Sequence, residues 1–233
     1  KNKKKYIARG YAKARKADLL VTSNVLEAIY EDNNDTESEI TVLKAKGNVF
    51  IKNQKAQIQG GKKARYNLKK EYFIVNGKKL ELISNEDRLT SNSTIEFWKN
   101  ENIAIATGKA KAYKNDKYSI FADKLVWHLI DDKEIGNKEK EGQGYQIKRI
   151  LAYKNVVIET NNEIAYSNKA LYNELSGICK LFGEVKLKKG DNFLTGEYAE
   201  MNLNTGISKL LPHPTKKTSE TENRVKALIK KNE

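Results

Sequence analysis

The sequence predicts an all-β protein built from repeated β-hairpins, and three observations lead to this class. Apolar and polar residues alternate along many short segments, the two-residue period of a strand with one apolar and one wet face. A hairpin-like unit recurs roughly every 30 residues. Both prolines, Pro212 and Pro214, lie near the C-terminal end, so no missing N–H interrupts a strand before Leu211.

The recurring unit has a constant order of parts. A small or apolar residue precedes a glycine or turn residue, two alternating strands follow around a polar turn, and an aromatic or apolar residue closes the unit. The units open at Gly10, Gly47, Gly77, Gly108, Lys154 and Gly183, and they close at Tyr30, Tyr66, Phe97, Trp127, Tyr172 and Met201. Turn chemistry is typical at residues 85–87, 114–116 and 189–192. The polar runs at residues 31–39 and 131–144 lengthen two units, and we expect surface loops there.

Two facing sheets of such strands would bury one continuous apolar strip between them. The tail differs from the array. We expect one β-domain over residues 1–211 and a mobile basic tail over residues 212–233, in which Ser219 or Thr221 caps a short helix. This helix would carry Val225, Leu228 and Ile229 on one face. No apolar core follows the lysines at residues 1–5, so we expect the chain to begin after any targeting segment.

The charge leaves two interpretations open. The chain has 44 Lys and Arg against 30 Asp and Glu, a net charge of +14. Six of the basic residues are arginines, and a lysine-rich surface suits loose attraction to polyanions better than sequence readout of bases. The charge indicates either a solvated surface or an anionic partner: nucleic acid, acidic lipid or acidic glycolipid. No apolar run approaches the length of a membrane-spanning helix.

No catalytic or metal-binding pattern emerges. The histidines, His128 and His213, are too few for a histidine-rich metal centre, and the single Cys179 allows no internal disulfide. The acidic pairs fall in predicted turns, and residues 60–63 (Gly-Gly-Lys-Lys) lack phosphate-loop spacing. We therefore expect no enzyme activity, cofactor or metal. Aromatic residues in a basic groove leave nucleic-acid stacking as an alternative, although their place at unit ends favours core layers.

Two stretches carry a resemblance to a known family: residues 45–51 continuing through 58–60 and 64–68, and residues 182–187 continuing through 190–192 and 195–206. Their pattern resembles the OstA-type repeat of the LptA/OstA-like periplasmic lipopolysaccharide-transport proteins. The resemblance implies a twisted, slightly open β-jellyroll (a β-taco) of two facing antiparallel sheets. It also implies that acyl chains lie inside, that sugar phosphates lie at the open edge, and that no catalytic residue exists.

The resemblance further implies transport of lipopolysaccharide across the periplasm, from the inner to the outer membrane, along a bridge of protomers joined end to end. Related β-jellyroll domains of the inner-membrane and outer-membrane components would be partners, and nucleic acid would not. We expect the lipid-binding residues to be Val49, Ile51, Ile58, Leu80, Leu82, Tyr118, Ile120, Trp127, Val156, Ile158, Ile164, Tyr166, Val185 and Leu187. The alternatives are a nucleic-acid-binding module and a purely structural β-repeat module.

Overall fold

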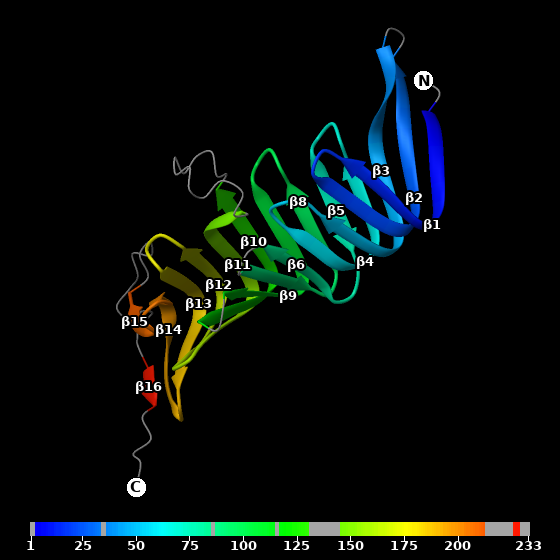
Figure 1. Cartoon of the computed structure of the whole chain (residues 1–233). Helices are drawn as coiled ribbons and strands as arrows, with labels where there is room; N and C mark the ends of the chain where they lie inside the picture. Colours follow the sequence, from blue (N-terminus) through cyan, green and yellow to red (C-terminus); the bar gives the residue numbers. More distant parts are fainter. Residues whose placement is uncertain are drawn as a thin grey trace. The chain divides into compact units, whose positions relative to one another are not determined.

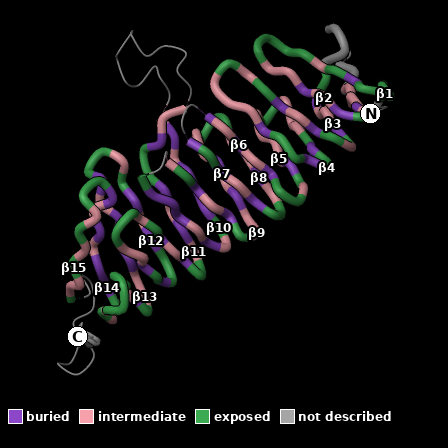
Figure 2. Tube along the Cα trace, turned by 60° about the horizontal axis from the view of Figure 1, so that its bottom comes forward, coloured by how far each residue is buried: buried purple, intermediate pink, exposed green. Residues whose placement is uncertain are grey.

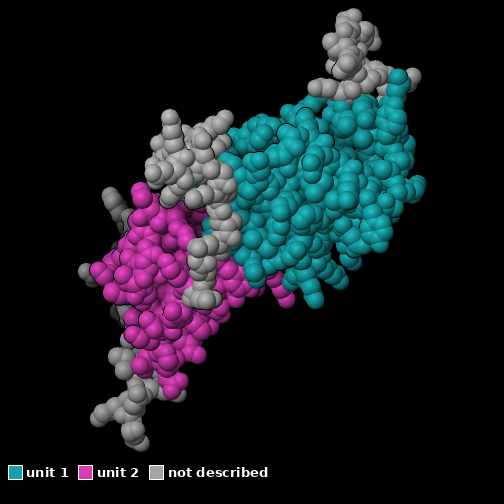
Figure 3. All heavy atoms as spheres, viewed as in Figure 1, with its two compact units in different colours: residues 1–108, 129–146 teal, residues 109–128, 147–233 magenta. Residues whose placement is uncertain are grey.

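The described part of the chain consists of strands and turns, which confirms the all-β class. The computed structural model describes residues 3–33, 36–84, 87–114, 117–130, 145–212 and 226–228. The chain divides into unit 1, residues 1–108 and 129–146, and unit 2, residues 109–128 and 147–233 (Figure 3). Within the described ranges there is no helix, and so none long and apolar enough to cross a membrane.

Unit 1 is an antiparallel sheet (Figure 1). Its strands are β1 (Lys3–Lys16), β2 (Leu19–Asn33), β3 (Thr36–Lys52), β4 (Gln57–Asn67), β5 (Tyr72–Asn76), β6 (Leu80–Ser84), β7 (Asp87–Ser91), β8 (Thr94–Trp98) and the first half of β9 (Ile103–Lys114). Strands β1 to β5 pair in chain order, and the order continues from β5 to β8 and β9. The short strands β6 and β7 pair with each other, β6 also with β4 and β7 also with β9.

Unit 2 is likewise built from antiparallel strands that form hairpins. Its strands are the second half of β9, most of β10 (Tyr118–Ile130), β11 (Gln146–Thr160), β12 (Ile164–Asn173), β13 (Ile178–Lys189), β14 (Asn192–Asn202), β15 (Ile207–Leu211) and β16 (Lys226–Leu228). Strands β9 to β15 pair in chain order. Strand β16 pairs with β14 beside β15. The turn predicted at residues 189–192 joins β13 to β14, whereas residues 85–86 and 115–116 of the other two predicted turns lie outside the described residues.

A two-residue bulge lies near the middle of five long strands. Two successive residues have φ between 47° and 86° at residues 10–11, 47–48, 108–109, 154–155 and 183–184. The register with the neighbouring strand shifts where its pairing is described, for example between Lys46 and Val49. Glycine adopts positive φ without a Cβ clash, which explains why glycine opens most of the units in the sequence. A bulge of this kind bends the strand and increases its twist.

Each bent strand that lies within one unit therefore contributes to two walls, one before its bulge and one after it. The two facing sheets that the sequence predicts are the two halves of the same strands within each unit. Side chains of the walls meet inside unit 2, where the rings of Tyr118 and Tyr172 lie 5.3 Å apart. Figure 2 shows buried residues recurring along the labelled strands, as alternation predicts. The turns lie on two rims, and the mouth of each unit is the gap between its rims.

In the middle of unit 1 the bend is made by a break between two short strands and not by a bulge within one strand. At Gly77 the chain leaves β5 and enters β6 after a short break instead of a bulge. A Cβ on Gly77 would lie 2.5 Å from the carbonyl oxygen of Gly60, so the backbones approach too closely for any side chain. The glycine that opens a unit thus allows two backbones to approach closely at Gly77, whereas the other opening glycines allow a positive φ.

Two expectations for polar segments were wrong. Residues 31–33 and 36–39 continue β2 and β3 instead of forming a loop, because their backbones pair with each other, Glu31 with Glu39 and Asn33 with Thr36. Lys226–Leu228 form a strand instead of part of a helix, pairing with Phe193–Thr195 of β14, which β15 leaves uncovered. The remainder of the tail after Pro212, and residues 131–144, lie outside the described residues.

The bulges predict a stabilising substitution. Lys154 has φ of 63° in the position that glycine occupies in most other units. Because a left-handed conformation costs a non-glycine residue about 1–2 kcal/mol, Lys154→Gly should raise the free energy of unfolding by about 0.5–1 kcal/mol in urea denaturation. The matched control is Lys188→Gly in the extended strand β13, which should lower stability by a similar amount. Equal destabilisation in both variants would contradict this account.

Candidate functional site

The candidate site is the apolar interior between the two walls of each unit. Most of the predicted strip is buried there, with Leu80 and Ile158 at 0% exposure. In unit 1 the buried members are Val49, Ile51, Ile58, Leu80 and Leu82; in unit 2 they are Tyr118, Ile120, Trp127, Val156, Ile158, Val185 and Leu187. Alternation along the sequence therefore located most of the inner face correctly.

Two members of the predicted strip lie on the other face. Tyr166 is 37% exposed, and it is paired in register with Lys186 of β13. Ile164 lies opposite Lys188 and is only partly buried. The inward residue between them is Ala165, fully buried opposite Leu187. The alternation was read in the wrong phase because the larger apolar residues here face outward, while the narrow interior accepts an alanine.

Alanines and further aliphatic residues complete the interior, and the sequence pattern did not predict them as part of it. Alanines occupy many inner positions, and apolar residues of the short strands β5 to β8 add to the core. The fully buried examples include Ala104, Ala106, Ala110, Ala122, Ala165, Ala199, Val75, Leu89 and Ile95. The signal was present as an alanine that recurs near the unit ends. Alanine is a poor marker of an apolar strip, because it is also common on surfaces.

One interior donor has no partner among the described residues. The indole Nε1 of Trp127 is buried and makes no hydrogen bond there. A buried donor that loses its water costs about 1–3 kcal/mol if nothing replaces it. The interior of unit 2 thus offers a hydrogen-bond donor among mostly apolar side chains.

An ion pair and a hydrogen bond connect the two rims at the mouth of unit 2. Lys114 at one rim forms an ion pair with Glu174 at the other. Ser208 Oγ donates a hydrogen bond of 2.6 Å to Glu163 across the same gap. Burial raises the pKa of Tyr172 beneath the mouth, so its hydroxyl stays neutral at physiological pH. These ties hold the two walls together in this unit.

The mouth of unit 1 is instead a hollow of about 500 Å³ between the rims. Four aromatic residues, Tyr66, Phe73, Phe97 and Tyr145, contribute to its lining, and the rings of Phe97 and Tyr145 lie 5.1 Å apart. Lysines and asparagines from both rims surround them. Lys99 pairs with Glu71 at 2.6 Å on one rim, and burial raises the pKa of Tyr66 beside this pair. The unit therefore opens through an aromatic and cationic mouth.

The titratable groups offer no catalytic arrangement within the described residues. Cys179 is fully buried, and burial raises the pKa of its thiol, so the nucleophilic thiolate is disfavoured. Burial and the nearby Arg149 and Lys148 lower the pKa of His128, which keeps it neutral at pH 7. No group of three potential metal ligands occurs in the part of the chain that the structure describes.

Bent hairpin repeats around an apolar interior define a β-jellyroll-type sleeve. A model of the family described as "LptA/(LptD N-terminal domain) LPS transport protein" matches residues 90–207, about half of the chain. The chain therefore belongs to this family of lipopolysaccharide-transport proteins, a family of transport proteins and not of enzymes.

Among solved structures, the chain is similar to the crystal structure of LptH from Pseudomonas aeruginosa, whose title calls it the LptA homologous periplasmic component of the lipopolysaccharide transport device. The two share 14% sequence identity over 76% of this chain and 95% of LptH, with a TM-score of 0.32. The comparison with curated proteins found no match.

The assignment of faces predicts unequal effects of truncation. Ile158→Ala should lower the free energy of unfolding by about 2–5 kcal/mol, because it leaves a cavity in the fully buried inner face. Tyr166→Ala on the outer face should change it by about 0.5 kcal/mol or less. Urea denaturation followed by tryptophan fluorescence measures both values. A loss at Tyr166 as large as that at Ile158 would show that the two faces are wrongly assigned.

Proposed function

We propose that this protein binds the acyl chains of lipopolysaccharide between its walls and passes the lipid across the periplasm, from the inner toward the outer membrane. The observation that carries the proposal is the predominantly apolar inner face of each unit, which includes Val49 and Leu80 in unit 1 and Ile158 and Leu187 in unit 2. Membership in a family of lipopolysaccharide-transport proteins supports it.

The energetics favour an acyl ligand. Transfer of one CH₂ group from water into an apolar site contributes about 0.8 kcal/mol, so a chain of a dozen carbons gains on the order of 10 kcal/mol. Inner side chains such as Leu80 already exclude water, so the lipid must part the walls to enter. The aromatic hollow of unit 1 is a suitable entry, whereas the tied rims of unit 2 oppose opening. An ester carbonyl of the lipid would also accept a hydrogen bond from Trp127 Nε1.

The edge strands support the further proposal that protomers, or related domains of membrane components, join end to end. Among the described strands β1 pairs with β2 alone, and β1 carries the exposed Tyr6, Ile7 and Tyr11. At the C-terminal edge of unit 2, Ile207 of β15 is 60% exposed. An unpaired strand edge with apolar side chains is a template for strand addition.

Site-specific photocrosslinking tests the lipid path. A benzoylphenylalanine at position 187, on the inner face, should crosslink to lipopolysaccharide, whereas the same residue at position 186, on the outer face, should not. Ile158→Glu, which puts a charge on the path, should reduce crosslinking at position 187 at least several-fold, provided circular dichroism shows an intact fold. Equal crosslinking at positions 186 and 187, or none at either, would refute the proposal and favour a structural module.

Native mass spectrometry over a range of protein concentrations tests end-to-end association. Ile7→Glu and Ile207→Glu should each shift the population toward monomer, because each puts a charge on an edge strand. Leu175→Glu is the matched control: Leu175 is 99% exposed but lies in the turn between β12 and β13. A shift caused by Leu175→Glu alone, or no oligomer at any concentration, would argue against edge pairing.

A further inference from the structure

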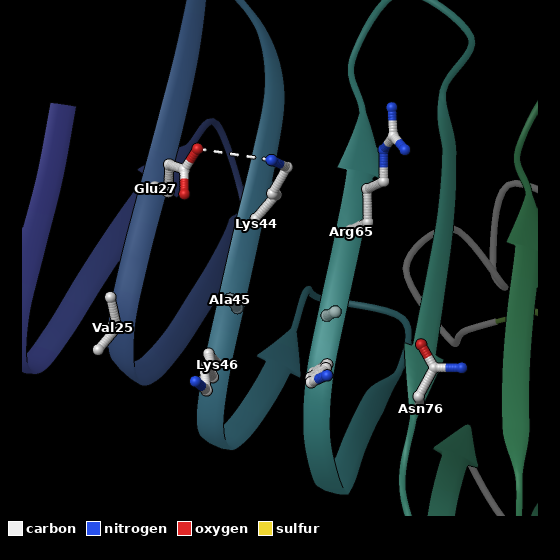
Figure 4. A pocket seen from close by; sticks show the side chains of 9 residues that line it. Val25, Glu27, Lys44, Ala45, Lys46, Arg65 and Asn76 are labelled. Carbon is white, nitrogen blue, oxygen red and sulfur yellow. Dashed lines mark hydrogen bonds and ion pairs between the residues drawn. The ribbon is translucent and has the colours of Figure 1, made fainter. Parts of the chain in front are cut away.

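A cationic hollow lies on the outer face of unit 1, across strands β2 to β5 (Figure 4). Its volume is about 340 Å³. Lys44 and Lys46 of β3 and Lys63 and Arg65 of β4 line it. Between them run Ala45 and Ala64, whose side chains are buried on the opposite face, so the floor of the hollow carries no long side chain. The hollow is therefore separate from the interior that we propose for acyl chains.

The strand register places like charges directly opposite each other here. Lys46 is paired with Lys63, and Lys44 is paired with Arg65. Like charges that face each other across an antiparallel pair destabilise the sheet. In the pairings β1–β2, β2–β3 and β11 to β15, the residue opposite each basic side chain is neutral or acidic. Two adjacent basic pairs are thus a local departure from how this chain otherwise arranges its lysines.

Internal compensation at the hollow is small. Glu27 is the one acidic residue in its lining, and it forms an ion pair of 3.4 Å with Lys44 (Figure 4). Lys46, Lys63 and Arg65 have no ion-pair partner among the described residues. The arrangement keeps several positive charges at one place without neutralising them, which is what an anion-binding site requires.

We propose that this hollow binds a phosphate group. A phosphate dianion would neutralise the facing lysines, and the guanidinium of Arg65 has the fork geometry that phosphate accepts. The volume leaves room for the sugar or glycerol that carries the phosphate. No aromatic residue lines the hollow, so base stacking has no platform there. The phosphate belongs either to a phospholipid headgroup or to a phosphorylated glycolipid, and both offer the same chemistry.

The test compares two double variants with equal charge change. Lys46→Gln/Lys63→Gln removes the facing pair. Lys13→Gln/Lys188→Gln removes two exposed strand lysines that face neutral residues. Three probes are used with the full chain: inorganic phosphate observed by ³¹P NMR, phosphatidylcholine vesicles with and without phosphatidylglycerol, and bisphosphorylated lipid A in detergent against its dephosphorylated form.

We expect Lys46→Gln/Lys63→Gln to weaken phosphate binding about tenfold and to raise the midpoint of thermal unfolding by about 1–3 °C, since the repulsion is relieved. The control variant should change neither. Selective loss of phosphatidylglycerol vesicle binding identifies a phospholipid as the source, and selective loss of binding to the phosphorylated lipid identifies a glycolipid. Equal binding by both variants, or no phosphate binding by the unmodified chain, would overturn the proposal. Crosslinking at position 187 would be unaffected, so a failure here leaves the acyl path intact.

Discussion

The left-handed bulge in the middle of the long strands is the constraint on which the rest of the structure depends. At residues 47–48 and 183–184, as at residues 10–11 and 154–155, two consecutive positive-φ residues bend a strand so that its halves belong to different walls. The walls enclose an interior because every second residue on each half points inward. Without the bend, the same alternation would produce a flat sheet with one large exposed apolar face, which a soluble protein rarely tolerates.

The positions of the bends and most of the inner face could be located from the sequence, because both depend on local patterns of residues. Glycine readily adopts positive φ, and the unit openings at Gly10, Gly47, Gly108 and Gly183 coincide with the bulges. The sequence pattern located these positions but did not identify them as bulges within strands. Lys154 was also recognised as an opening, and it adopts the same conformation without being glycine. The two-residue period then located the inner face for strands with large apolar residues.

Features that depend on pairing partners could not be predicted in this way. Ile164 and Tyr166 were placed on the wrong face, since which face of β12 is inner depends on its register with β11 and β13. The strand at Lys226–Leu228 depends on an edge that β15 leaves open, a fact of topology and not of helix propensity. The aromatic mouth joins Tyr66, Phe97 and Tyr145 from distant parts of the chain, and the facing lysine pairs emerge only once β3 and β4 are aligned.

The bulges also mean that the width and the length of the sleeve are determined by different features of the chain. The distance from bulge to rim, a few residues at about 3.3 Å each, determines how wide the enclosed path is. The number of hairpins determines how long it is, because each added hairpin extends a unit by about 10 Å along the direction of strand pairing. Gain or loss of one whole repeat would therefore alter the reach of such a protein while its bore stayed constant, which makes repeat number an accessible route for adapting it to gaps of different width.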